Sequence, residues 1–294
     1  MDVKLHALFH PMQANGRDPA YTYSEWPPSP ALKPYVACYW ASEPARLQAA
    51  LLQKGGSAVD RVLPDGCTDL LFEQDLVQGS YQLRYCGIFD QSFTISYDEH
   101  RPVRKFGVRF FPGGAPVFFK LQASSFMNQQ APLDALWSGP AGELGERLNE
   151  ASSAARRAEL MDGWLLSMLD SGAVTVQPGD TLKNGLYRIF ITAGNVSVRE
   201  LAETEGISTR QLNRKFDQWI GMGPKRFSEI VRFQAVLRDI RQHPGTDGMT
   251  IALAQGFFDQ AHFIREFRRF YGETPGKAQA EYRIMSDLYK PGTV

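Results

Sequence analysis

The sequence has few cysteines and no long hydrophobic run. Its 294 residues include only Cys38, Cys67 and Cys86, which are too few and too scattered for a disulfide scaffold, so we expect a protein of the reducing cytoplasm. No apolar stretch approaches the roughly 18 residues that a membrane-spanning helix needs, and the first residues lack the shape of a signal peptide. These absences argue against an integral membrane protein and against a membrane as partner.

The cysteines also give no sign of a metal centre. Together with His100 they form no pair of the CxxC or HxH kind, whereas a zinc site needs such spacing. This pattern favours buried cysteines that behave as small apolar residues. We therefore expect no catalytic residue, no metal and no cofactor, although Cys67 is of interest because it follows the Pro64-Asp65-Gly66 turn.

Positive charge is scarce in the first part of the chain. The net charge is zero, but residues 1–180 hold 15 Lys and Arg against 20 Asp and Glu, whereas residues 181–294 hold 17 against 12. A basic segment attached to an acidic one makes a polyanion a candidate partner. The length and the 43% hydrophobic content predict two globular domains.

Short β-prone runs separated by turn residues occupy the first part of the sequence. Their spacing predicts a β-rich N-terminal domain over residues 1–150, folded as a small antiparallel sandwich or barrel. The runs are YVACYW (35–40), CTDLLFE (67–73), YQLRYCGIF (81–89), FTISY (93–97) and FGVRFF (106–111).

Aromatic residues are dense in these runs. Most are expected in the core of the sheet, and some are candidates to line a cavity for a small apolar or aromatic effector, because ligand pockets are mostly apolar. The sequence identifies no polar anchor for such a ligand. The aromatic residues are Tyr35, Tyr39, Trp40, Phe72, Tyr81, Tyr85, Phe89, Phe93 and Tyr97.

From about residue 141 apolar residues recur at helical spacing. Their stripe over 155–172 predicts a helix that either packs on the β-rich domain or docks on a second copy of the chain, which would make a homodimer. Residues 151–178 then form a helix and linker between the first domain and a helical domain over 179–294. The stripe consists of Leu160, Met161, Trp164, Leu165, Met168 and Leu169.

The last third of the chain repeats itself. LAETEGI (201–207) returns fifty residues later as IALAQGF (251–257), and similar residues follow each copy at matching spacing. Each copy has a short capped helix, a glycine at the turn and a second capped helix, which is the pattern of a helix-turn-helix unit. The expected caps are Ser197, Ser208, Asp247 and Asp259, and the expected second helices are Thr209–Ile220 and Gln260–Tyr271.

The second helix of each copy carries residue types that recognise DNA. Arg pairs with guanine and Asn or Gln with adenine in the major groove, and the candidates for this role are Asn213, Arg214, Gln260 and Arg265. Phosphate contacts hold position without reading sequence. The candidates for them are Thr209, Lys215, Lys225, Arg226, Arg268 and Arg269.

A long helix predicted over 224–243 separates the two copies. Roughly 19 helical residues span about 28 Å, which with the flanking units places the reading helices about 34 Å apart, one turn of duplex. One chain would then read two successive major-groove segments.

The segment from about 182 to 283 resembles the DNA-binding domain of the AraC/XylS family of bacterial transcription regulators. GFFDQAHFIREFRRFYGETP (256–275) and LAETEGISTRQLNRKF (201–216) carry the resemblance. It implies a seven-helix module with two helix-turn-helix units joined by a rigid helix. The base-reading positions that it implies are Arg210, Asn213, Arg214, Gln260, Ala261, His262 and Arg265.

The N-terminal part resembles more loosely a sensor domain of some family members, at RVLPDGCTDLLF (61–72) and FPGG (111–114). Two residues depart from the family pattern. Gly248 replaces an aliphatic helix residue and is expected to weaken its helix by about 1 kcal/mol. Asp217 replaces a basic residue and would repel a phosphate that it faced.

The expected fold class is α+β, with a β-rich sensor domain followed by an all-α DNA-binding domain with two helix-turn-helix units. The favoured function is a sequence-specific transcription regulator, not an enzyme, that binds double-stranded DNA and responds to an unidentified small effector. RNA polymerase is a further candidate partner. The alternative is a metal- or thiol-dependent enzyme or DNA-repair protein that uses the helix-turn-helix units for delivery.

Overall fold

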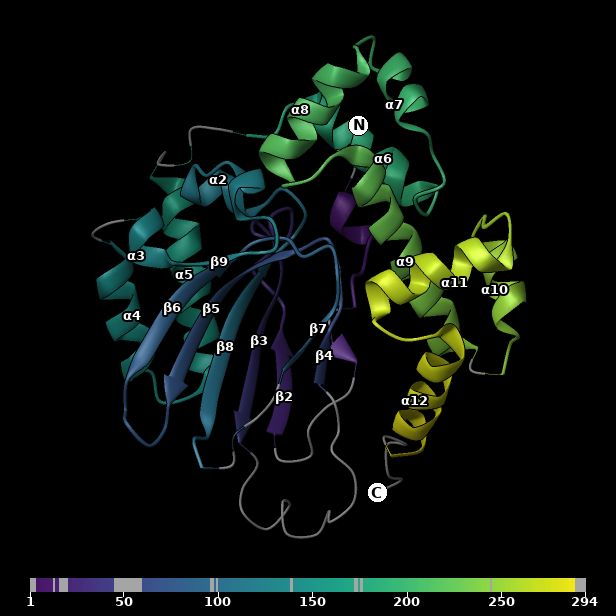
Figure 1. The fold of residues 1–294 in the computed structure, drawn as a ribbon. Helices are drawn as coiled ribbons and strands as arrows, with labels where there is room; N and C mark the ends of the chain where they lie inside the picture. Colours follow the sequence, from purple (N-terminus) through teal and green to yellow (C-terminus); the bar gives the residue numbers. More distant parts are fainter. Residues whose placement is uncertain are drawn as a thin grey trace.

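The computed structural model describes residues 4–12, 14–15, 21–44, 60–95, 98, 100–137, 140–171, 174, 177–243 and 245–288. Strands fill the first part of the chain and helices the second, which confirms the expected α+β class (Figure 1). Among the helices in these residues, none combines the length and the apolar character needed to cross a bilayer.

The N-terminal part contains all the strands of the described chain. They are β1 (Ala14–Asn15), β2 (Tyr21–Trp26), β3 (Val36–Pro44), β4 (Asp60–Val62), β5 (Thr68–Asp75), β6 (Tyr81–Cys86), β7 (Phe93–Ile95), β8 (Val103–Phe110) and β9 (Gln130–Pro132). The short helices between them and the C-terminal part are η1 (Leu5–Ala7), α2 (Ala115–Phe119), η2 (Ala123–Phe126) and α3 (Leu133–Leu136).

Two antiparallel sheets form the N-terminal domain. The larger has the order β2-β3-β8-β5-β6-β9 and the smaller the order β1-β4-β7. All five predicted β-prone runs contain a strand, and β1, β2, β4 and β9 are additional to them. Tyr97, at the end of the fourth run, lies outside the described residues.

The two faces of the larger sheet differ in polarity because successive side chains of a strand point to opposite sides. One face carries buried apolar residues such as Tyr39, Phe72 and Phe106. The alternate positions carry charged residues, Asp69 on β5 and Arg109 on β8, which are aligned as direct neighbours across the two strands. The apolar face is covered by helices, and the charged face borders a cavity.

Two helices, α4 (Pro140–Glu150) and α5 (Ala154–Asp170), follow the sheet in sequence and lie beside it (Figure 1). Met161 and Leu165 of α5 are fully buried, and α5 contacts β3 and β8. Asp162 accepts a hydrogen bond of 3.0 Å from the Tyr39 hydroxyl. The interpretation that this stripe packs on the β-rich domain is therefore confirmed, and the homodimer stays a prediction.

The C-terminal part is all helical. Its helices are α6 (Asp180–Ile191), α7 (Val198–Thr204), α8 (Thr209–Trp219), α9 (Pro224–Gln242), α10 (Gly248–Ala254), α11 (Gln260–Tyr271) and α12 (Pro275–Leu288). The repeat is confirmed as two helix-turn-helix units, α7–α8 and α10–α11, on either side of α9. Both turns contain a glycine with positive φ, Gly206 at 64° and Gly256 at 75°.

Gly248 lies in a helix, as expected: it is the first residue of α10, directly after the cap Asp247. A glycine costs more stability in a helix interior, where it exposes backbone, than at the helix start. The weakening of about 1 kcal/mol stays a prediction, and this position favours a smaller value.

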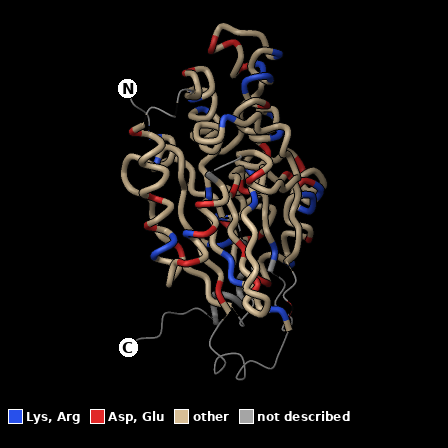
Figure 2. Tube along the Cα trace, turned by 90° about the vertical axis from the view of Figure 1, so that its left-hand side faces the viewer, with Lys and Arg blue, Asp and Glu red and all other residues tan. Residues whose placement is uncertain are grey.

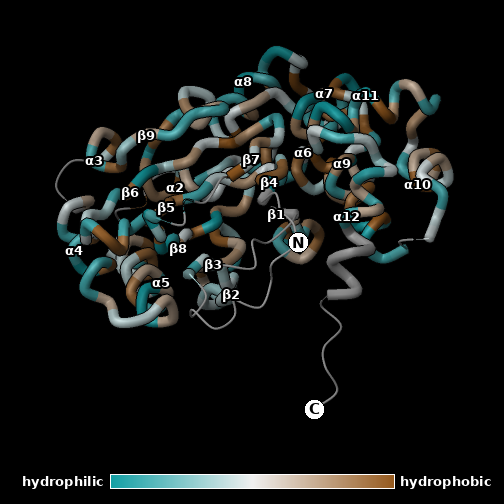
Figure 3. Tube along the Cα trace, turned by 60° about the horizontal axis from the view of Figure 1, so that its bottom comes forward, coloured by the Kyte–Doolittle hydropathy of each residue, from teal (hydrophilic) through white to brown (hydrophobic). Residues whose placement is uncertain are grey.

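The N- and C-terminal parts share one hydrophobic core. Phe9 stacks on Phe190 of α6 with ring centroids 4.7 Å apart, and Phe111 packs edge-on against the same ring at 5.8 Å. A view from below places the sheet between α4–α5 on one side and α9–α12 on the other (Figure 3). Seen from the side of α3 and α4, basic and acidic residues are interspersed along the Cα trace (Figure 2).

Candidate DNA-reading surface and sensor cavity

The first candidate reading helix, α8, is held by the cap that the sequence predicts. The Ser208 hydroxyl accepts a hydrogen bond from the backbone N–H of Gln211, and the Gln211 side-chain oxygen accepts one from the backbone N–H of Ser208. The full capping box therefore forms. Arg210 and Arg214 are exposed. Asn213 is half-buried, and its side-chain amide donates to the carbonyl of residue 209 in its own helix at 2.7 Å.

The second candidate reading helix, α11, is capped by Asp259, which accepts from the His262 amide at 2.7 Å. Gln260, Ala261 and Arg265 are exposed on it. His262 is half-buried, with its Nε2 atom 3.5 Å from a Glu266 carboxylate oxygen. The apolar face of α11 is buried, as expected, through Phe263, Phe267 and Phe270.

The residues predicted to contact phosphate lie in different environments. Thr209, Lys225 and Arg268 are exposed, and Lys215 is half-buried. Arg269 is exposed and its guanidinium lies 3.5 Å from Glu229 of α9.

Arg226, the sixth predicted phosphate contact, is engaged inside the protein. Its Nη2 atom donates to Asp90 of the N-terminal domain at 2.6 Å, and Nη1 lies 3.4 Å from Glu229. Asp90 is fixed in turn by Asn128, whose side-chain amide donates to it at 2.9 Å. In this structure Arg226 therefore joins α9 to the N-terminal domain, a contact that the sequence does not reveal.

A groove of about 1150 Å³, here called the α8 groove, is lined by α8 and by the 120–127 segment of the N-terminal domain. On the α8 side its lining includes Arg210, Asn213, Arg214 and Asp217. Burial raises the pKa of Asp217. The candidate reading residues of α8 therefore border the same groove as the 120–127 segment of the N-terminal domain.

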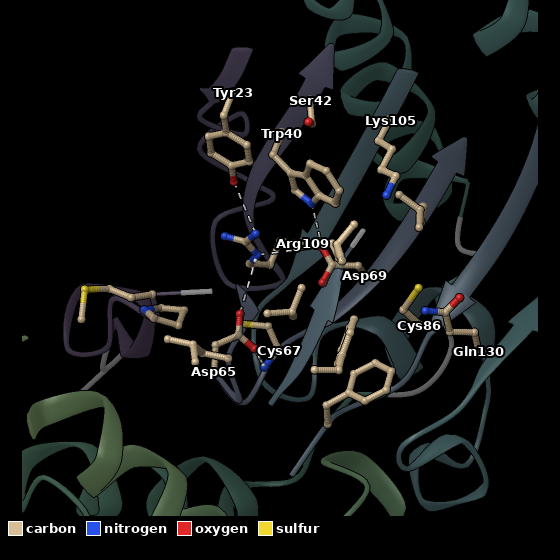
Figure 4. A pocket seen from close by; sticks show the side chains of 18 of the residues that line it. Tyr23, Trp40, Ser42, Asp65, Cys67, Asp69, Cys86, Lys105, Arg109 and Gln130 are labelled. Carbon is tan, nitrogen blue, oxygen red and sulfur yellow. Dashed lines mark hydrogen bonds and ion pairs between the residues drawn. The ribbon is translucent and has the colours of Figure 1, made fainter. Parts of the chain in front are cut away.

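A second cavity, of about 630 Å³, lies on the charged face of the larger sheet. We call it the Arg109 cavity. It is closed on the opposite side by residues of β4 and β7 and by Pro11 and Met12 near the start of the chain. Six of its polar or charged lining residues are Tyr23, Trp40, Asp65, Asp69, Lys105 and Arg109 (Figure 4). Glu25 and Glu73 line it as well.

Arg109 is 4% exposed and faces an excess of negative charge. Its guanidinium lies 3.6 Å from Glu25, 3.7 Å from Asp65 and 3.9 Å from Asp69, and it donates to the Tyr23 hydroxyl at 3.5 Å. These separations are long for charge-assisted hydrogen bonds, which are usually about 2.7–2.9 Å. The guanidinium is therefore surrounded by acceptors but held closely by none of these four.

Asp65 is buried beside this arginine, in the predicted Pro64–Gly66 turn. Its Oδ1 atom accepts from the Cys67 amide at 2.9 Å, whereas its Oδ2 atom has no hydrogen-bond partner in the described structure. Nε of Arg109 is likewise without one. Burial raises the pKa of Asp65 to about 6, with the nearby Arg109 lowering it and Asp69 raising it further.

The aromatic residues divide between the two roles that the sequence allowed. Tyr39, Phe72 and Tyr85 belong to the core, whereas Trp40, Phe89 and Phe93 line the Arg109 cavity. The expectation of a mainly apolar lining is wrong, because the cavity lies on the charged face of the sheet.

The cysteines behave as buried thiols. Cys67 and Cys86 are buried and Cys38 is half-buried. Burial raises the pKa of Cys38 and of Cys86 to about 12, which keeps both thiols protonated. Within the described ranges, His, Cys, Asp and Glu nowhere gather in a group of three that could hold a metal ion.

The turn that carries Asp65 also contacts α9. Gln234 of α9 donates to the Pro64 carbonyl at 2.7 Å and exchanges two hydrogen bonds with the Met12 backbone, at 2.7 and 2.9 Å. Gly66, with φ of 78°, lies against the ring of Phe227, where an added Cβ would come within 2.9 Å. One side of this turn therefore faces the Arg109 cavity and the other side faces α9.

Two family models match the chain. Residues 24–132 match a domain family described as a domain of unknown function, DUF6597, and residues 201–281 match a helix-turn-helix domain family. The second match covers both helix-turn-helix units. Residues 201–281 form an AraC-family helix-turn-helix domain.

The relatives of this AraC-family domain are regulators. The chain is 31% identical over 84 residues to a probable thc operon regulatory protein of Rhodococcus erythropolis, and 34% identical over 80 residues to an uncharacterized HTH-type transcriptional regulator of Haemophilus influenzae. These matches cover 28% and 27% of this chain and 25% and 26% of the relatives. The aligned part thus spans about a quarter of each relative.

Among solved structures, ToxT from Vibrio cholerae O395 is similar to the chain at 10% identity and a TM-score of 0.38. The match covers 74% of this chain and 88% of that chain.

The sequence did not identify Asp65, Asp69 and Arg109 as a group. The signal was weak: in CTDLLFE Asp69 and Glu73 fall on the same side of a strand, and in FGVRFF Arg109 falls on the side opposite to Phe106. Alternation alone normally indicates a face exposed to water. The predicted sandwich or barrel would cover one face of the sheet, but the sequence does not show that β4 and β7 lie over the charged face and make it part of a cavity.

Proposed function

We propose that the chain is a sequence-specific DNA-binding transcription regulator whose N-terminal domain responds to a small molecule. The AraC-family domain supports the first part, since helix-turn-helix units bind the major groove through their second helix. The second part is supported by the turn that joins the Arg109 cavity to α9.

Double-stranded DNA is the proposed partner, read by α8 and α11. The exposed Arg210, Arg214 and Arg265 have the reach and the fork geometry for guanine. Gln260 and His262 stand in the first turn of α11, from which side chains contact bases in helix-turn-helix proteins. Lys225 and Arg268 are exposed beside the reading helices and suited to phosphates.

Control by the N-terminal domain is proposed to act through α9, the helix that joins the two units. Gln234, Phe227 and Arg226 of α9 all contact the N-terminal domain. A ligand that shifts the Pro64–Cys67 turn changes the position of α9 against the N-terminal domain. This in turn changes the relative placement of α8 and α11. The 120–127 segment also borders the reading face of α8, so a change in domain packing alters access to that face.

The reading assignment is tested with Arg214→Ala and Lys225→Ala. On a duplex selected by the full-length protein, Arg214→Ala should reduce the binding free energy by about 1–3 kcal/mol and relax the sequence preference at one base pair. Lys225→Ala should weaken binding to all DNA sequences alike, and should reduce the magnitude of the slope of log affinity against log salt concentration by about one. Affinities are measured by fluorescence anisotropy at several salt concentrations.

Each variant is the control for the other, because both remove one positive charge from the same domain. If Arg214→Ala weakens cognate and unrelated duplexes equally, α8 does not read bases. If both variants bind as the unmodified protein does, neither residue contacts DNA.

A further inference from the structure

The Arg109 cavity contains an acceptor and a donor that are buried, adjacent and unsatisfied. Oδ2 of Asp65 and Nε of Arg109 are 3.7 Å apart, and both lack a hydrogen-bond partner within the described residues. The two residues are 5% and 4% exposed. Leaving such atoms unpaired costs free energy that a ligand can recover by bonding to both.

The polarity of this pair specifies the matching group. Asp65 requires a donor and Arg109 an acceptor, so a ligand that satisfies both presents an N–H next to a carbonyl oxygen. A carboxylate ligand satisfies only the arginine. It would also meet Glu25, Asp65 and Asp69, three carboxylates around one guanidinium, which makes this end of the cavity repel anions.

A flat aromatic surface lies next to the pair. The Trp40 ring lies against the backbone of Gly107, where an added Cβ would be 2.2 Å from the ring, and Trp40 lines the cavity. Its Nε1 atom donates to Asp69 at 2.7 Å, which fixes the orientation of the indole. Tyr23 stacks beside it with centroids 6.1 Å apart. A planar ring gains by packing on such a surface.

We propose that the Arg109 cavity binds a neutral, planar cyclic lactam or ureide, such as the hydrogen-bonding edge of a purine or pyrimidine base, with that edge against Arg109 and Asp65. The ring N–H donates to Asp65 Oδ2, the adjacent carbonyl accepts from Arg109 Nε, and the ring packs on Trp40. The volume of about 630 Å³ is within the range of about 300–1,000 Å³ that small-molecule sites occupy.

This binding has a consequence for the proposed effector response, on which the regulatory part of the inference rests. Both atoms are screened from solvent, so a ligand edge that bonds to both of them has to shift Asp65 or Arg109. Asp65 belongs to the turn whose Pro64 carbonyl is bonded to Gln234 of α9. Binding of the ligand therefore displaces the hydrogen bond by which Gln234 holds α9 against the turn.

The test is isothermal titration of the full-length protein with hypoxanthine and with uracil, which distinguishes a purine from a pyrimidine source. At least one should bind saturably. The N-methylated analogues 1-methylhypoxanthine and 1,3-dimethyluracil, which lack the lactam N–H, should bind at least about tenfold more weakly, because Asp65 is left without a donor. This comparison uses the unmodified protein and does not depend on how a variant folds.

Asp65→Asn tests the protein side. Oδ1 of Asp65 is held by the Cys67 amide, so the new side-chain nitrogen should replace Oδ2 and face Arg109 with a donor. Binding should weaken at least about tenfold. Asp134→Asn makes the same chemical change at an exposed position on α3 and should leave binding unchanged.

Three results would overturn the proposal: no saturable binding of either base by folded protein at about 1 mM, equal binding of the methylated analogues, or binding of the planar anion benzoate in their place. All three would leave the proposed DNA binding intact, because it is measured separately on duplexes. Conversely, a base that binds through Asp65 but does not change the affinity for DNA supports the site and removes the effector response from the proposed function.

Discussion

At the scale of single residues, Asp65 combines the strongest constraints. It is buried, its pKa is raised to about 6 by burial, and one of its oxygens is unpaired. A carboxylate in this position costs stability whenever it is ionised.

The raised pKa of Asp65 gives a pH dependence with a definite sign. The folded carboxyl keeps its proton to higher pH than the unfolded one, whose pKa is near 3.8, so the folded state binds the proton more tightly. The free energy of unfolding should therefore fall as the pH rises from about 4 to about 7, by up to about 3 kcal/mol from this group.

Asp65→Asn removes this dependence. Urea unfolding of both proteins across that range should show the variant gaining stability relative to the unmodified protein as the pH rises. If the stability gained by the variant relative to the unmodified protein stays constant or shrinks as the pH rises, the pKa of Asp65 is not raised in the folded state.

The exposure of Arg210, Arg214 and Arg265 was predicted from sequence because helical spacing separates a polar face from a buried one. Their contacts with DNA stay predictions. The partner of Arg226 could not be named in this way, because Asp90 is distant in sequence and only the packing of the two domains brings them together.

At the scale of the elements, the reading helices depend on their caps. Ser208 closes the capping box that starts α8. Ser208→Ala should lower the free energy of unfolding by about 1 kcal/mol, because amides at the helix start lose their partner. Ser152→Ala, at an exposed serine just before the α5 cap, should change it by less than about 0.5 kcal/mol. Equal effects of the two changes in thermal unfolding would show that the box contributes nothing.

The contact between Arg226 and Asp90 ties α9 to the N-terminal domain. Asp90→Ala should release Arg226 for a phosphate and loosen the domain contact, raising DNA affinity roughly fivefold, or about 1 kcal/mol. Arg226→Ala breaks the same contact but also removes the charge, so it should not reproduce the full gain in DNA affinity. Anisotropy titrations of both variants, with Asp134→Ala as control, separate the two effects. A loss of affinity in Asp90→Ala would show instead that the ion pair holds the reading conformation.

Element boundaries in the repeat were predictable because local chemistry sets them. Ser208, Asp247 and Asp259 cap the helices that the sequence assigned to them, and Gly206 has the positive φ that the turn needs. The same local signals missed β1, β2, β4 and β9. Strand pairing depends on partners far along the chain, as in the pairing of Asp60 with Ile95, and a short run gives little sign of it.

At the scale of the whole molecule, the two parts are joined more closely than the sequence suggests. Composition and charge separate an acidic first part from a basic second part, which predicts two independent domains. The structure instead shows a shared core in which Phe9 stacks on Phe190, and polar contacts such as that between Arg61 and Glu281 at 3.2 Å. In the proposed regulator, this interface is the route by which a ligand in the cavity acts on α8 and α11.

The central claim is that two helices of one chain read two adjacent stretches of duplex. The most direct measurement is selection of bound duplexes from a random pool by the full-length protein, by Arg214→Ala and by Arg265→Ala. We predict two conserved blocks about one helical turn apart, with Arg214→Ala relaxing one block and Arg265→Ala the other. A single block, or two blocks that both variants relax alike, would contradict the account.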